Sequence, residues 1–120
     1  MEKICLINRS KETILGEAIE LAQTSGERNK GLLGRQGLDP GGGLWIIPTE
    51  AIHTFWMKFA IDLVFLDRKR RVTKVVPRLK PFRLAMSWRA YSVVELPAGV
   101  AELTRTEAGD QIEKKEVSAT

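Results

Sequence analysis

Short runs of apolar residues, separated by turn residues, predict a chain built mainly from strands. The strongest run is 61–66, where one aspartate interrupts five apolar residues, and a second run at 72–76 follows the turn 68–70. Two runs of strand length with a short connection predict an antiparallel hairpin. Gly16 interrupts an alternating pattern, which predicts a bulge or bend there. Further strands are expected over residues 3–7, 13–22, 44–47, 91–96 and 111–114.

One helix is expected after the second strand. Thr24 and Glu27 have the spacing of a capping box, in which each side chain binds the other residue's backbone N–H. The helix is predicted to continue through Leu33, with Gly34 as its left-handed terminal residue. A helix of roughly ten residues is marginal alone, so Leu32 and Leu33 must pack on a sheet.

The remaining segments complete the predicted domain. Residues 36–43 are rich in glycine but lack the Gly-Lys-Ser/Thr ending of a phosphate-binding loop, so a flexible loop is expected. Residues 77–81 are expected to be irregular, and 97–103 to form a turn or short helix. The pattern predicts a strand-dominated α+β fold, an antiparallel sheet curled into a barrel-like shape with one short helix packed on it. Residues 1–114 would form one globular domain and 115–120 a frayed tail.

Charge is distributed unevenly along the chain. Nine basic and no acidic residues lie between 68 and 94, whereas the rest of the chain has ten basic and 15 acidic residues. This asymmetry predicts a positive face and bears on partners rather than on fold. Aromatic residues interleave with the basic ones, as on many single-stranded nucleic-acid surfaces. Candidate contacts to RNA, DNA or another polyanion are Arg70, Arg71, Lys74, Arg78, Arg83, Trp88 and Arg89. A merely solvated basic face is the alternative.

Several classes of protein are disfavoured by composition. The single cysteine cannot form an internal disulfide, and one histidine with one cysteine is too few for a typical zinc or iron site. We therefore expect no metal and no cofactor. The N-terminal apolar run is only four residues long, too short for a secretory signal or a membrane span. The expectations are a cytoplasmic location and no membrane-spanning segment.

Asp62 is the most unusual polar residue, because the positions around it in its strand are apolar. An unpaired buried carboxylate would cost several kcal/mol, so donors must reach it. The expected donors are Arg28, Arg35 or the backbone N–H groups of the turn 56–60. A structural aspartate that holds this turn is one interpretation, and a ligand-binding or functional acid is the other. His53 has the same two interpretations, as a structural hydrogen-bonding group or as a ligand contact.

The leading hypothesis is a non-catalytic module that binds an unknown small molecule or protein. Its cleft would lie where the helix, the segment 53–57 and Asp62 converge, although ordinary core packing also explains the apolar residues there. No catalytic residue is assigned, and an enzyme using Asp62 and His53 as acid and base is a third hypothesis. The candidate ligand-binding residues are His53, Thr54, Phe55, Met57, Asp62, Arg28 and Arg35.

A set of short motifs resembles one known family. The motifs are Glu27-Arg28, Gly31-Leu32-Leu33, the run His53-Thr54-Phe55 with Met57, Ile61-Asp62 and Phe65-Leu66-Asp67, then Glu95-Leu96-Pro97-Ala98-Gly99 and Gly109-Asp110. Together, from about residue 16 to 112, they resemble the domain of unknown function 192 family, an uncharacterised protein family. The resemblance implies a compact, strand-rich single domain with no established reaction. Many relatives are exported behind a leader.

Overall fold

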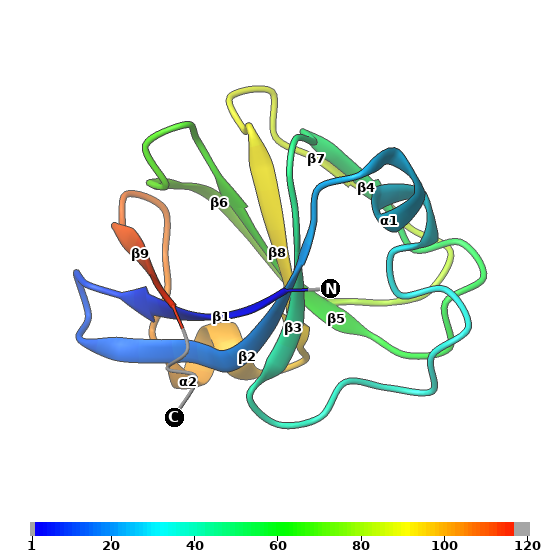
Figure 1. The fold of residues 1–120 in the computed structure, drawn as a ribbon, viewed down its shortest axis with the longest axis horizontal. Helices are drawn as coiled ribbons and strands as arrows, with labels where there is room; N and C mark the ends of the chain where they lie inside the picture. Colours follow the sequence, from blue (N-terminus) through cyan, green and yellow to red (C-terminus); the bar gives the residue numbers. More distant parts are fainter. Residues whose placement is uncertain (1, 117–120) are drawn as a thin grey trace.

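A computed structural model describes residues 2–116. Seven strands form one sheet in the order β6-β5-β8-β3-β2-β1-β9, and two short strands form a separate β4–β7 ribbon. The strands are β1 Lys3–Asn8, β2 Thr13–Ala22, β3 Gly42–Ile46, β4 Ala51–His53, β5 Ile61–Leu66, β6 Val72–Leu79, β7 Leu84–Met86, β8 Ser92–Pro97 and β9 Ile112–Glu116. The helices are α1 Ser25–Lys30 and α2 Val100–Leu103. Helix α1 and the ribbon lie together at one end of the molecule (Figure 1).

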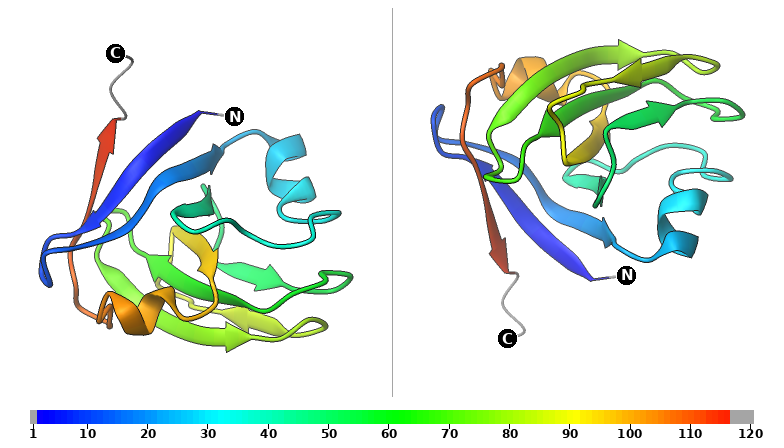
Figure 2. Two further views of the ribbon diagram at one scale, coloured as in Figure 1. Left: turned by 90° about the horizontal axis from the view of Figure 1, so that it is seen from below. Right: turned by 90° about the horizontal axis from the view of Figure 1, so that it is seen from above.

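The large sheet curls until its two outermost strands approach each other at one end (Figure 2). An isolated bridge joins Arg71, beside β6, to Gln111, beside β9. The N–H of Val72 also donates to the carbonyl of Asp110 at 2.8 Å. Every strand pair is antiparallel except β2–β3. The predicted strand-dominated α+β fold with a curled antiparallel sheet is confirmed, with a second short helix, α2, in addition.

The two faces of the sheet carry separate hydrophobic cores. Side chains alternate between the faces along each strand, so β5 sends Val64 and Leu66 to the inside of the curl and Leu63 and Phe65 to the outside. The segment after α1 and the β4–β7 ribbon cover the outer face. All six residues of β5 are buried, because both of its faces are covered.

Two local predictions are confirmed in detail. Strands β5 and β6 form the expected hairpin, in which Val64 lies opposite Val75. The β1–β2 register shifts on both sides of the Leu6–Gly16 pair, as expected of a bulge. A Cβ atom at Gly16 would lie 2.8 Å from the backbone oxygen of Gly41, so only glycine fits this close approach.

Helix α1 begins as predicted but ends early. Its capping box is present, with the Glu27 N–H donating to Thr24 Oγ1 and the Thr24 N–H donating to the Glu27 carboxylate, both at 3.1 Å. The helix stops at Lys30 rather than Leu33, because Gly31 adopts a φ of 48° that is incompatible with a helix. Leu32 is buried against the outer face as expected.

Other differences concern short or edge elements. Strands β4 and β7 were not predicted. The segment around Pro77 is not irregular as predicted, because β6 continues to Leu79; as the outermost strand, β6 tolerates a residue without an N–H. Strand β9 reaches Glu116, and the rest of the predicted tail lies outside the described residues. Neither helix in the described part of the chain is long and apolar enough to cross a membrane.

Candidate functional site

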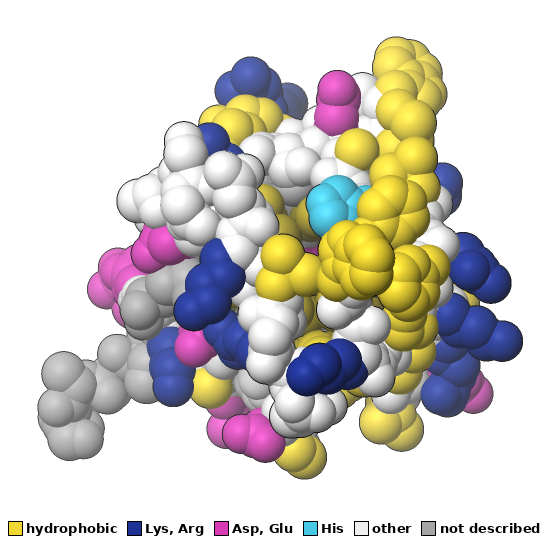
Figure 3. Space-filling view, turned by 90° about the vertical axis from the view of Figure 1, so that its right-hand side faces the viewer, with side chains coloured by type: hydrophobic (Ala, Val, Ile, Leu, Met, Phe, Trp, Pro, Cys, Tyr) yellow, Lys and Arg dark blue, Asp and Glu magenta, His cyan; other side chains and the backbone are white. Residues whose placement is uncertain are grey.

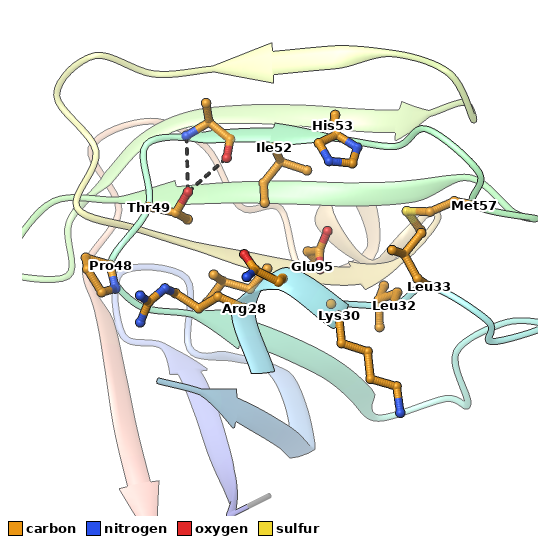
Figure 4. Close-up of a pocket in the computed structure, with 14 residues that line it drawn as sticks. Arg28, Lys30, Leu32, Leu33, Pro48, Thr49, Ile52, His53, Met57 and Glu95 are labelled. Carbon is orange, nitrogen blue, oxygen red and sulfur yellow. Dashed lines mark hydrogen bonds between the residues drawn. The ribbon is translucent and has the colours of Figure 1, made fainter. Parts of the chain in front are cut away.

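A cavity of about 270 Å³ opens between α1, the β3–β4 connection and the ribbon. Its walls are mixed: Leu32, Ile52 and Met57 are apolar, whereas Asn29, Thr49 and His53 are polar. The carboxyl group of Glu95, on β8, points into the space below Ile52 and His53 (Figure 4). The side chains of Arg28 and Lys30 also line the cavity, but in Figure 4 they extend away from Glu95. The acidic group among the residues that line this cavity is therefore the carboxyl of Glu95.

Glu95 is buried without the partners that a buried carboxylate needs. Its side chain faces the outer core, only 3% of the residue is exposed, and its Oε1 accepts no hydrogen bond from any residue in 2–116. Burial raises the pKa of Glu95 to about 8, although the positive charge of Arg35 acts in the opposite direction. At neutral pH the group is therefore mostly a neutral carboxyl, which offers one O–H donor and one carbonyl acceptor.

The cations near Glu95 are committed to other partners. Arg35 Nη2 lies 2.6 Å from the Glu20 carboxylate. Arg28 Nη1 donates to the backbone oxygens of Gln23 at 2.6 Å and Ile47 at 3.4 Å. No described guanidinium or ammonium group therefore forms an ion pair with Glu95. The arrangement suits a molecule that brings its own hydrogen-bonding group.

The structure brings together only some of the predicted ligand-binding residues. His53, Met57 and Arg28 line the cavity, whereas Thr54, Phe55, Asp62 and Arg35 do not. Thr54 is buried and ties two segments together, since its hydroxyl donates to the Lys80 carbonyl at 2.7 Å and accepts from the Arg83 N–H at 2.9 Å. Phe55 is exposed beside His53, with ring centroids 5.1 Å apart.

Asp62 is fully buried and is held by backbone donors, which confirms that its carboxylate is satisfied. Its Oδ1 accepts from the Arg78 N–H at 2.8 Å, and its Oδ2 accepts from the N–H groups of Gly99 at 3.1 Å and Ala101 at 2.8 Å. The expected donors, Arg28, Arg35 and the turn 56–60, were wrong. The side chain lies with the inner-face residues of β5, away from the cavity.

This placement separates the two residues of the enzyme hypothesis. Asp62 belongs to the inner face of the sheet, whereas His53 lies on the ribbon that covers the outer face. The helix, the 53–57 segment and Asp62 therefore do not form the single cleft that was expected. The cavity is lined by Glu95, whereas Asp62 is buried against backbone N–H groups elsewhere in the fold.

The predicted basic contacts are likewise divided. Arg70 and Arg71 lie at the turn beside β9, where Arg71 Nη1 donates to the Gly109 carbonyl at 3.2 Å. Arg78 faces Glu102 across 3.6 Å at the other end of the β5–β6 hairpin. The remaining candidates, Lys74, Arg83, Trp88 and Arg89, lie on or beside β7 or contact it. Nucleic-acid binding by this tract stays a prediction.

Glu95 was not predicted as a site residue. The available signal was a lone acid within the apolar run 91–97, the same signal that singled out Asp62. Glu95 also begins one of the motifs on which the family resemblance rests. Sequence alone does not show which of two such acids meets hydrogen-bond donors.

The sequence matches uncharacterised proteins. A family model for domain of unknown function 192 (DUF192), described as an uncharacterized ACR, matches residues 6–114. A UPF0127 protein of Pyrococcus abyssi is 33% identical and aligns over 90% of this chain and 95% of its own length. A UPF0127 protein of Thermococcus sibiricus is 32% identical over 90% of this chain and 73% of its own length.

Two crystal structures share the fold. A protein of unknown function from Novosphingobium aromaticivorans superposes with a TM-score of 0.75 at 23% identity, covering 92% of this chain and 83% of that one. A putative transcription regulator from Sinorhizobium meliloti superposes with a TM-score of 0.81 at 21% identity, covering 94% and 92%. The match of the family model over most of the sequence, together with relatives above 30% identity, shows that this chain belongs to the DUF192, or UPF0127, family.

Proposed function

We propose that this protein is a non-catalytic binding module whose cavity holds a small molecule against Glu95. The observation that carries the proposal is that Glu95 lines the cavity while its buried Oε1 has no hydrogen-bond partner among the described residues. A buried polar atom without a partner costs about 1–3 kcal/mol, and a ligand that supplies the missing hydrogen bond recovers part of that free energy.

Binding suits the site better than catalysis. A general acid needs a reacting partner held within hydrogen-bond reach by other polar groups. The Thr49 hydroxyl, which also lines the cavity, already donates to the Ala51 carbonyl at 2.8 Å (Figure 4). Arg28 is engaged with backbone carbonyls, as described above. A buried carboxyl that forms no ion pair with a described residue fits recognition of one polar group of a ligand.

The chemistry of the site indicates the class of ligand. A neutral carboxyl pairs best with a group that offers one donor and one acceptor side by side, as a primary amide does. The aliphatic side chains in the lining, Leu32, Ile52 and Met57, can contact a small hydrocarbon body attached to that amide. Pockets for drug-sized molecules reach roughly 300–1,000 Å³, so a cavity of about 270 Å³ favours a smaller molecule.

The proposal is tested by titrating the protein with small aliphatic amides such as isobutyramide, using chemical-shift changes at His53 and Met57 as the readout. Binding should weaken as the pH rises above about 8, where Glu95 loses its proton. Glu95→Gln retains a donor and an acceptor, so it should bind but lose the pH dependence. Glu95→Met should bind at least about tenfold more weakly, as expected for one lost hydrogen bond to a buried group.

Glu116→Gln provides a matched control, because Glu116 is exposed on β9. It should leave both affinity and pH dependence unchanged. Equal amide affinity in the wild type and in Glu95→Met would overturn the proposal, as would the failure of every amide to shift these resonances at millimolar concentration.

A further inference from the structure

Six large apolar side chains are exposed on and beside the β4–β7 ribbon. They are Phe55, Trp56, Phe82, Leu84, Met86 and Trp88, and together we call them the aromatic ridge. Trp56 and Trp88 are the most exposed of the six, at 74% and 76%. Figure 3 shows hydrophobic side chains gathered in a continuous band beside the histidine. A contiguous exposed apolar surface in a folded domain generally marks an interaction site.

The backbone actively presents these side chains to solvent. Alternation along β7 turns Leu84 and Met86 outward, while Ala85 between them is buried. Trp56 and Phe82 both have positive φ angles, 68° and 63°, and their rings meet edge to face at 5.4 Å. Bulky residues rarely adopt positive φ, and such backbone strain clusters where it has a role.

Basic residues predominate around the ridge, although the exposed acid Glu50 lies immediately before β4. The segments 51–61 and 68–94, which contain the ridge, have ten basic residues and no acidic residue. Lys74 Nζ donates to the Met86 carbonyl at 2.9 Å, and the Arg89 guanidinium lies 5.0 Å from the centre of the Trp88 ring. Arg83 belongs to the same strand connection, and its guanidinium contacts the Phe82 carbonyl. An apolar band with a cationic border is complementary to an apolar layer beneath an anionic surface.

We propose that the aromatic ridge docks on the surface of an anionic lipid bilayer. Tryptophan rings and Lys or Arg side chains are the groups that prefer the membrane–water interface. Basic residues are attracted to anionic headgroups, and exposed apolar side chains gain by entering the boundary with the acyl chains. Leu84 and Met86 favour a bilayer over single-stranded nucleic acid, because aliphatic side chains provide no ring on which a base can stack.

The test is sedimentation of the protein with vesicles of phosphatidylcholine, with and without phosphatidylserine, at low and high salt. Tryptophan emission is the second readout, since Trp56 and Trp88 would move from water into lipid whereas Trp45 is already buried. We expect binding and a blue shift with phosphatidylserine, and weaker binding at high salt. The double variant Leu84→Ser/Trp88→Ser should bind at least about 30-fold more weakly. Replacing Arg83 or Arg89 by Ser should weaken binding about fivefold each.

Two controls separate the ridge from general effects of the substitutions. Leu103→Ser removes a side chain that is 81% exposed but lies on α2, and Lys114→Ser removes an exposed charge on β9. Both variants should bind vesicles like the wild type. The proposal is overturned if the wild type does not bind phosphatidylserine vesicles, or if Leu84→Ser/Trp88→Ser binds them equally well. It is also overturned if the double variant instead loses binding to a single-stranded RNA, or loses self-association, that the wild type shows in the absence of vesicles.

Discussion

Asp62 and Glu95 are two buried acids on neighbouring strands with opposite surroundings. In the β5–β8 ladder Asp62 lies opposite Leu96, and Leu63 lies opposite Glu95, so the acids are one position apart on different faces of the same sheet. The Asp62 carboxylate accepts three backbone hydrogen bonds, whereas Glu95 Oε1 accepts none from the described residues. Burial alone therefore does not mark a functional acid, and the supply of donors distinguishes the two.

The nearest helix explains the difference in donors. Asp62 faces the beginning of α2, where the first N–H groups of a helix have no partner within the helix. The N–H groups of Gly99 and Ala101 are thereby satisfied. Glu95 faces the cavity lined by the end of α1, residues 28–30, and the C-terminal end of a helix presents carbonyls rather than N–H groups. Carbonyls cannot donate to a carboxylate, and the negative end of a helix disfavours its charge.

The largest expected effect is on Asp62. Asp62→Ala leaves the N–H groups of Arg78, Gly99 and Ala101 buried without an acceptor, so the free energy of unfolding should fall by about 3–5 kcal/mol. Urea denaturation measures this loss. Asp39→Ala, at an exposed position in the loop before β3, should change stability by less than about 0.5 kcal/mol. A loss below about 1 kcal/mol for Asp62→Ala would mean that the hydrogen bonds from these N–H groups to the carboxylate do not stabilise the fold.

The next effect is a pH dependence that comes from Glu95. Its pKa is about 8 in the folded protein and 4.5 when unfolded. The folded protein therefore holds a proton that the unfolded chain releases, and stability is lost as the pH rises through that interval. Between pH 5 and 8 this contribution amounts to about 3 kcal/mol.

Glu95→Gln isolates that contribution, because an amide does not titrate. Thermal or urea unfolding of the wild type and of Glu95→Gln across this pH range should show the variant gaining stability relative to the wild type as the pH rises. If the free energies of unfolding of the two proteins differed by the same amount at every pH, Glu95 would not keep its proton to high pH.

The smallest expected effect is that of the positive charge of Arg35 on the pKa of Glu95. Arg35 lowers the pKa of this carboxyl, so Arg35→Gln should raise the pKa further. A half-exposed, paired cation acts weakly, and the effect on stability should stay below about 1 kcal/mol. Titration of the Glu95 carboxyl carbon by NMR measures the change, and Arg9→Gln, at an exposed ion pair with Glu113, is the control. A pKa that falls in Arg35→Gln would reverse the assigned sign.

Much of the sheet was predictable because its signals are local. The β5–β6 hairpin, the bulge at Gly16 and the capping box of α1 each depend on residues close together in sequence. The β4–β7 ribbon was missed because each strand has three residues and their pairing joins segments about thirty residues apart. Gly31 was predicted to lie inside the helix, because a glycine at that point is compatible with either a helix interior or a helix end. The sequence does not give its φ angle, which is what ends the helix.

The candidate site was predictable only in part. His53 and Met57 were expected to contact a ligand and do line the cavity. Glu95 could not be distinguished from Asp62, since each is one acid in an apolar strand. The donors that satisfy Asp62 come from segments 16 and more residues away in the sequence. Which acid is left without partners is therefore a property of the tertiary structure.

The pairing of the first strand with the last has a consequence for how the protein is made. Strand β1 lies between β2 and β9, and Asn8 Nδ2 donates to Asp110 Oδ2 at 2.9 Å, 102 residues further along the chain. A ribosome must release the chain through Asp110 before this contact can form, and closing so long a loop is entropically unfavourable. Until then the outer edge of β1 has no neighbour, and this edge is where a newly synthesised chain would be most vulnerable to pairing with another.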